Sequence, residues 1–192
     1  MVPLGLCSIA GLAVFVERFI ALRKNHLIRP EIVGILEGTD GEDGLETLRS
    51  TCGHHPGSFA SLVLVCLEAR SRPVAEAKEL IGDAARKEIR AIQRGLPILD
   101  MISVIAPLLG LLGTVLGMIR VFQALAAGGI GQATVLSGGI SEALVSTAVG
   151  LTVAIPAYIG HGFLLHRSEA LVMLMEDRIN GLLDVLHRRQ GH

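Results

Sequence analysis

The chain has 192 residues, of which 51% are hydrophobic and 18% are charged, with a formal net charge of −1. Soluble domains average about 25% charged residues, and this charge balance lacks the positive field that nucleic-acid binding uses. The charges are also unevenly placed, because between Met101 and His166 the only Asp, Glu, Lys or Arg residues are Arg120 and Glu142. The distribution excludes an ordinary soluble domain and indicates a bilayer protein with water-exposed segments.

Three segments are long and apolar enough to cross a hydrocarbon core, which takes about 20 helical residues. They are predicted at residues 1–22, 98–123 and 139–162. The first does not resemble a signal peptide, because charges follow it and none precede it. The predicted fold class is an all-α membrane protein with three transmembrane helices extended by long cytoplasmic helices.

The positions of Lys and Arg predict the direction of the spans. Of the 17 such residues, all but Arg120 lie in or beside the two charged segments, and the connection 124–138 carries no charge. The positive-inside rule then places the N-terminus outside and makes 124–138 a periplasmic loop. It makes 23–97 a cytoplasmic helical domain and 163–192 a cytoplasmic C-terminal helix.

The charged segments are predicted to be helical from the spacing of their apolar residues. Helices are expected over 30–51 with a break at 38–41, from 58 onward, over 73–96 and over 167–189. Pro97 is expected to kink the helix over 73–96 into the second span rather than end it. The apolar stripes of 73–96 and 167–189 need partners, which are either each other or neighbouring copies. Together with the small-residue face of the second span, they predict a homo-oligomer.

The second span carries small residues on one face, and small residues let helix backbones approach closely in lipid. Pro107 frees a backbone carbonyl that must be satisfied inside the protein. The hydroxyl of Thr114 is either part of a functional site or bonded back to its own helix. The candidate packing residues of this span are Ala106, Pro107, Gly110, Gly113 and Gly117.

The third span contains an acid, Glu142, and several hydroxyls. An acidic side chain at mid-bilayer costs about 2.5–3.5 kcal/mol on insertion scales. Glu142 is therefore expected to face a wet interior or to stay protonated through desolvation; the alternative is snorkelling to the outer interface. The other candidates in this span are Thr147 and the packing residues Gly150 and Pro156.

Two long motifs carry a resemblance to a known family. Ala106–Ile119 resembles the second-span signature of the ExbB/TolQ family, relatives of the flagellar stator subunit MotA, and Ile140–Ala157 resembles the third-span signature. The resemblance covers about residues 58–186. It implies a proton-channel subunit of an inner-membrane motor that uses the proton motive force to energise outer-membrane or periplasmic transport. By motif position it implies a proton pathway of Thr114, Thr147 and Glu142.

The resemblance also implies partners and a location. These are a homopentamer around a single-span ExbD/TolR-like protein with an essential aspartate, a TonB-like or TolA-like transducer, and the bacterial inner membrane. The C-terminus would be cytoplasmic and the N-terminus periplasmic. Many members continue the third-span motif with a Tyr-Asn pair, whereas this chain reads Tyr158-Ile159-Gly160-His161. The choice between the ExbB and TolQ branches therefore stays open, and Arg120 is expected to be a snorkelling outer anchor.

Other functions fit less well. A TolQ-like subunit for envelope integrity and a non-conducting membrane scaffold remain as alternatives, and proton flux that responds to Glu142→Gln separates the scaffold from the motor. A permease would show more spans and inverted repeats. No enzyme or cofactor is predicted, since the chain has neither a phosphate-binding loop nor a recognisable Ser/His/Asp arrangement. No nucleic-acid partner is predicted, since the chain has no basic charge excess. No metal site is predicted, because Cys52, His54 and His55 lack zinc-ligand spacing.

Overall fold

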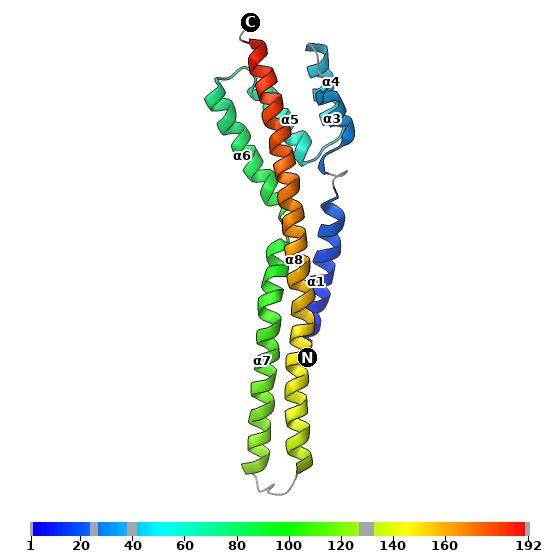
Figure 1. The fold of residues 1–192 in the computed structure, drawn as a ribbon, viewed down its shortest axis with the longest axis vertical. Coiled ribbons are helices and arrows are strands. Elements are labelled where there is room, and N and C mark those ends of the chain that lie inside the picture. The colour runs from blue at the N-terminus through cyan, green and yellow to red at the C-terminus, as the bar shows by residue number, and fades with distance from the viewer. Residues whose placement is uncertain (1, 24–26, 38–41, 127–132, 191–192) are drawn as a thin grey trace. The chain divides into compact units, whose positions relative to one another are not determined.

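The computed structural model describes residues 2–23, 27–37, 42–126 and 133–190 (Figure 1). Every regular element within these ranges is an α-helix, which confirms the predicted fold class. The chain divides into two compact units. Unit 1 contains residues 1–18 and 95–163, and unit 2 contains residues 19–94 and 164–192. The break expected at 38–41 lies outside the described residues.

Among the residues that the structure describes, three helices have the length and apolar composition of membrane spans. They are α1 (Val2–Ala21), α7 (Leu96–Ala126) and, within the longer helix α8 (Ala133–Gln190), the stretch Ser137–Leu186. The charged part of the chain forms shorter helices. These are α3 (Pro30–Glu37), α4 (Glu42–His54), α5 (Ser58–Ala69) and α6 (Val74–Ile92).

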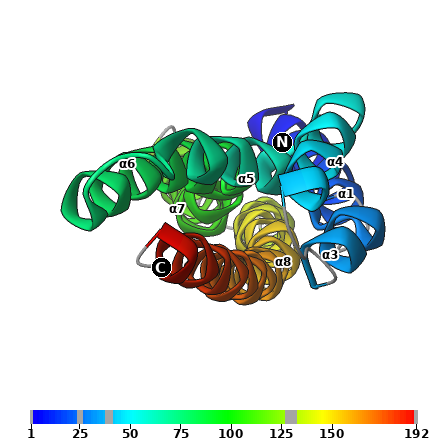
Figure 2. The same cartoon turned by 90° about the horizontal axis from the view of Figure 1, so that it is seen from above.

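Unit 1 is built from most of α1, from α7 and from the first half of α8. The views of Figures 1 and 2 show α7 (green) beside the yellow part of α8, and the contacts described below join these two helices. Leu4, Ala106 and Ala154 form a buried core with one residue from each of the three helices. Phe15 of α1 also packs directly over Gly160 of α8. Most large apolar side chains on the outer faces remain exposed, which is typical of surfaces that meet lipid or other membrane helices.

Unit 2 has a separate core centred on α5. Phe59, Val63 and Cys66 are almost completely buried, as are Leu164 and Ser168 of α8. Helix α5 packs against both α4 and α6, and Figure 2 shows it between them. This repeated burial at helical spacing explains why the segment is helical, since an amphipathic helix gains most of its stability from packing.

The end of α1 is held in unit 2 by an arginine from α8. Arg167 Nε donates a hydrogen bond of 2.9 Å to the carbonyl of Leu22, and its guanidinium lies 5.8 Å from the centre of the Phe19 ring. A cation beside the last carbonyls of a helix interacts favourably with the helix dipole. Arg167 therefore caps the C-terminal end of α1.

The predicted kink at Pro97 was wrong. Helix α6 ends at Ile92, and a separate helix α7 begins at Leu96. Gly95 between them has a φ of +88°, a left-handed conformation that residues other than glycine rarely adopt. Pro97 lies in the first turn of α7, where its missing N–H costs no helical hydrogen bond. Gly95 therefore sets the break, and Pro97 begins a new helix.

The predicted third span and the predicted tail helix are parts of one continuous helix, α8. Pro156 lies inside it, as Pro107 lies inside α7. Neither proline ends its helix, because apolar helices tolerate proline where neighbouring groups satisfy the freed carbonyl.

Candidate functional site

The candidate residues meet along a close contact between α7 and α8 in unit 1. Gly110 and Gly150 lie backbone to backbone at its centre. A Cβ built on Gly150 would lie 2.7 Å from the Ala106 carbonyl oxygen and 3.1 Å from Gly110 Cα. A Cβ built on Gly110 would lie 2.9 Å from the Ser146 carbonyl oxygen. The approaches of 2.7 Å and 2.9 Å are closer than real Cβ atoms make, and both are to backbone oxygens, so both positions require glycine.

The contact continues toward the end of α7 and the beginning of α8, one helical turn at a time. A Cβ on Gly113 would overlap the Ser146 side chain, and one on Gly117 would lie 3.1 Å from Ala143 Cβ. At the next step the pairing reverses, and the Val121 side chain fills the space beside Gly139. Each small residue thus faces a complementary one, as in close helix pairs in membranes. The small-residue face of α7 is filled by α8 of the same chain.

Thr114 and Thr147 flank this contact, and both are half-buried. Thr114 Oγ1 donates a hydrogen bond of 2.7 Å to the Leu111 carbonyl of its own helix, which is the local bond considered above for this residue. Thr147 lies at the crossing, with its Cα 3.2 Å from the position of a Cβ on Gly110. The backbone of Thr147 is therefore fixed by packing.

Glu142 forms an ion pair that sequence reasoning did not identify. Arg120 Nη1 of α7 lies 3.7 Å from Glu142 Oε1 of α8, and the two side chains are 72% and 68% exposed. The sequence held a signal for this pair, because these are the two charged residues of the long apolar stretch and have opposite signs. The structure thus gives Arg120 a partner within its own chain.

A second acid–base pair joins the same two helices toward the beginning of α7. His161 Nδ1 of α8 lies 3.8 Å from Asp100 Oδ1 of α7, and the side chain of His161 is only 19% exposed. The sequence analysis assigned no role to His161 or to Asp100. The pairing depends on which positions face each other across two helices, and only the three-dimensional structure determines that.

The cysteines and possible metal ligands form no further site in the part of the chain that the structure describes. No group of three His, Cys, Asp or Glu side chains could hold a metal ion in those residues. Cys52 and Cys66 are buried free thiols in unit 2. Burial raises the pKa of both, that of Cys66 to about 12, so neither resembles a reactive cysteine, whose pKa is lowered.

The fold and this helix pair define a class of protein. It is an all-helical membrane protein in which two apolar helices meet through glycine and carry an acid, a base and hydroxyl groups among few other polar groups. The sequence pattern of the MotA/TolQ/ExbB proton channel family matches residues 59–177, from α5 to well beyond the apolar part of α8. The chain belongs to this family.

Comparison with individual proteins supports the same family. The Tol-Pal system protein TolQ of Haemophilus influenzae is 36% identical over 108 residues, which cover 55% of this chain and 46% of TolQ. An ExbB-like protein of Synechocystis is 36% identical over 165 residues, 81% of this chain and 62% of the relative. Biopolymer transport protein exbB1 of Vibrio cholerae is 39% identical over 109 residues, 54% and 47% respectively. The matches therefore span about half to somewhat under two thirds of these relatives.

Proposed function

We propose that this chain is the proton-channel subunit of an inner-membrane motor that couples the proton motive force to transport or envelope maintenance. Relatives named TolQ and relatives named for biopolymer transport both match, so the proposal covers both kinds of complex. The chain acts as a channel subunit and not as an enzyme. Moving one charge through 100 mV releases about 2.3 kcal/mol, enough to bias a conformational step of similar size.

The observation that carries the proposal is the exposure of Glu142 on an apolar helix. Its side chain is 68% exposed, and its carboxylate Oε1 lies 3.7 Å from Arg120 Nη1. An ionisable group on a membrane helix is costly when it faces lipid, so such groups face water, a cavity or a partner. We assign Glu142 to the water-facing entrance of a proton path, with the hydroxyls of Thr114 and Thr147 further along it. A hydroxyl both donates and accepts, so it can hold water or a partner carboxyl without carrying charge.

The path needs a partner that receives the proton. We propose a homo-oligomer, a pentamer by family resemblance, that surrounds a single-span ExbD/TolR-like protein with a membrane aspartate. A TonB-like or TolA-like protein would carry the motion onward. In this arrangement the N-terminus and residues 124–138 are periplasmic, while 23–97 and 163–192 are cytoplasmic, in keeping with the positions of Lys and Arg. The exposed apolar faces of α1, α7 and α8 supply surfaces for lipid and for neighbouring copies.

The test is proton flux through the complex purified from native membranes in mild detergent and reconstituted in liposomes containing a pH-sensitive dye. Mass spectrometry of the same sample should show several copies of this chain with a single-span protein that carries a membrane aspartate. Thr114→Val, Thr147→Val and Glu142→Gln should each lower proton flux with the complex intact. A wild-type complex that conducts no protons would overturn the proposed function.

Thr152→Val provides the matched control. The Thr152 hydroxyl donates a 2.8 Å hydrogen bond to the Ala148 carbonyl of its own helix. Thr152 lies beyond Thr147 on the side away from Glu142, about 140° around the helix from Thr147 and about 80° from Glu142, so it shares a face with neither residue. The control makes the same change of side chain on a different face of α8, so it should leave flux unchanged. Equal loss in Thr147→Val and Thr152→Val would indicate a general effect on the helix and not a path at Thr147.

A further inference from the structure

Asp100 and His161 lie on the same faces of α7 and α8 as the two threonines. Asp100 is fourteen residues before Thr114, and His161 is fourteen residues after Thr147. Fourteen residues are close to four helical turns, so each pair is separated by about 21 Å along the axis and only about 40° around it. A path that follows both threonines along these helices therefore leads to the Asp100–His161 pair.

Polar groups continue along α7 between Thr114 and Asp100. Ser103 lies on the same face about three turns from Thr114, is half-buried and donates a 2.6 Å hydrogen bond to the Asp100 carbonyl. Pro107 has no N–H to donate to the Ser103 carbonyl, the usual helical acceptor for residue 107. Between Thr114 and Asp100, this face of α7 therefore carries the Ser103 hydroxyl and the Ser103 carbonyl, which Pro107 leaves without its usual helical donor.

The two acid–base pairs are separated by about one membrane thickness. Asp100 and Arg120 are twenty residues apart on α7, and Glu142 and His161 are nineteen apart on α8, so both separations are about 30 Å. The hydrocarbon core is also about 30 Å thick. The Arg120–Glu142 and Asp100–His161 pairs thus mark opposite edges of the apolar part of unit 1, with the threonines between them.

We propose that His161, stabilised by Asp100, is the proton-exchange group at the end of the path opposite Glu142. A proton arriving along the path adds to the unprotonated ring nitrogen of His161 and converts the imidazole to an imidazolium. The Asp100 carboxylate, 3.8 Å from Nδ1, stabilises that cation. The imidazolium then releases one proton to water and returns to the neutral ring, ready for the next proton. Imidazole suits this step because it changes charge near neutral pH.

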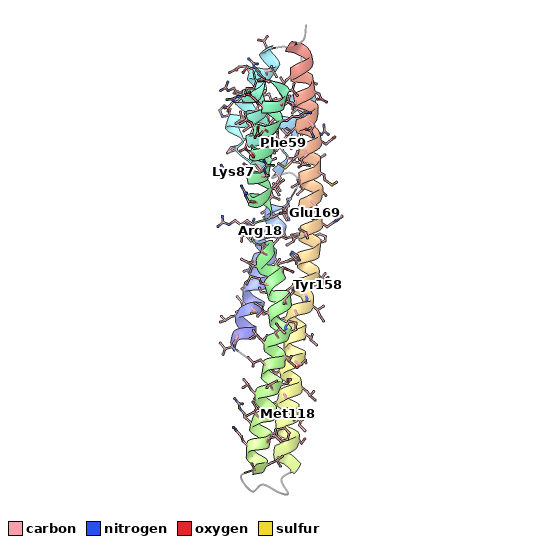
Figure 3. All side chains as sticks on the ribbon, turned by 90° about the vertical axis from the view of Figure 1, so that its left-hand side faces the viewer. Arg18, Phe59, Lys87, Met118, Tyr158 and Glu169 are labelled. Carbon is pink, nitrogen blue, oxygen red and sulfur yellow. The ribbon has the colours of Figure 1, made fainter. Side chains whose placement is uncertain are left out.

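The charged residues named here on the elements beside His161 come from α7, from α1 and from α8 itself. Helix α7 presents Asp100, and α1 places Phe15 over the neighbouring Gly160. The charged residues that follow Phe15 on α1 are Glu17 and Arg18, which pair with each other at 2.6 Å. Figure 3 labels Arg18 on α1 and Tyr158, one turn before His161, on α8. Helix α8 itself next carries His166 and Arg167.

This inference rests on the proposed function, and its test uses the same reconstituted complex. Proton flux is measured across the neutral pH range, in which imidazole side chains in general change charge, for wild type, His161→Gln, Asp100→Asn and the control His166→Gln. His161→Gln should lower flux about tenfold or more and remove the imidazole-dependent part of the pH profile. Asp100→Asn should lower flux while a pH-dependent profile persists, because the ring remains. His166→Gln should behave as wild type.

The outcomes separate the inference from the proposed function. A conducting wild type with flux lost in Thr147→Val but unchanged in His161→Gln would overturn the role of His161 and leave the proposed function intact. Equal effects of His161→Gln and His166→Gln would also overturn it. Size-exclusion chromatography of each variant checks assembly. If His161→Gln fails to assemble, His161→Asn and Asp100→Asn supply the same comparison, and unchanged flux in an assembled variant of either residue overturns the proposal.

Discussion

The side chain of Ser146 occupies the space directly over Gly113, where any Cβ would overlap it. The two residues belong to different helices and fit together within one chain. The small residues of α7 therefore pack against α8 of the same chain and need no second copy as a partner. This relationship changes what substitutions on that face should do: their first effect falls on the fold of unit 1, and any effect on assembly follows from it.

The Gly113–Ser146 fit predicts a compensating pair of substitutions. Gly113→Ala should destabilise the protein by about 1–3 kcal/mol, because the new Cβ overlaps the Ser146 side chain. Adding Ser146→Gly removes the atoms in the way and should recover most of the loss. The measurement is a double-mutant cycle by thermal unfolding in detergent. Gly162→Ala is the control, since a Cβ there meets nothing within 4 Å. Additive effects of the two changes would contradict the contact.

Gly150→Ala should be more damaging than Gly117→Ala. The Cβ at Gly150 would meet the Ala106 carbonyl oxygen and the Gly110 backbone, which cannot move without separating the helices. The Cβ at Gly117 would meet the Ala143 side chain at 3.1 Å, which a small shift can relieve. Unfolding temperatures of the two variants test the order. Equal temperatures would show that α7 and α8 do not approach most closely at Gly150.

The Arg120–Glu142 pair should matter more for activity than for stability. Both side chains are mostly exposed, and exposed ion pairs contribute about 0–1 kcal/mol. Arg120→Gln and Glu142→Gln should therefore unfold within a few degrees of wild type, whereas Glu142→Gln should lower proton flux. Comparison of unfolding and flux in the same preparations checks this. Full flux in Glu142→Gln would leave Glu142 as a snorkelling residue at the membrane interface.

Cys66 should react slowly with thiol reagents in the folded protein. Burial raises the pKa of its thiol from 9.0 to about 12, so little thiolate is present at pH 8 and alkylation should wait for unfolding. Because the folded pKa lies above the unfolded one, the folded state holds its proton more tightly. Stability should therefore be complete below about pH 9 and fall as the pH rises toward 12. Alkylation rates and alkaline unfolding of wild type and Cys66→Ala test both statements. Rapid labelling at pH 8 without unfolding would contradict them.

The buried cysteines also decide how orientation can be measured. Cys52 and Cys66 are inaccessible from either side, so their failure to label says nothing about topology. A cysteine-free chain with Lys87→Cys or Ala124→Cys places the probe at an exposed position. An impermeant maleimide applied to intact cells should label Ala124→Cys and not Lys87→Cys if 124–138 is periplasmic. The reverse pattern would invert the proposed orientation.

Much of this protein follows from the sequence alone. A long uncharged stretch in lipid must satisfy its backbone hydrogen bonds internally, as an α-helix does. The helical class and the three candidate spans therefore follow from composition and length. The motifs at Ala106–Ile119 and Ile140–Ala157 pointed to the family that the comparison then showed. The sequence also offered, as one of two options, that the Thr114 hydroxyl donates a hydrogen bond to a carbonyl of its own helix.

The tertiary structure decided which faces meet. Helical spacing places Ala106, Gly110, Gly113 and Gly117 on one face, but spacing cannot say whether that face meets the same chain or another copy. The structure pairs it with Ser146 and Gly150 of α8. It likewise pairs Arg120 with Glu142 and Asp100 with His161. These pairings depend on the register and rotation of two helices far apart in sequence, and periodicity within one helix carries no information on either. The break before α7 belongs here too, because it depends on the backbone conformation of Gly95 and not on the proline that follows.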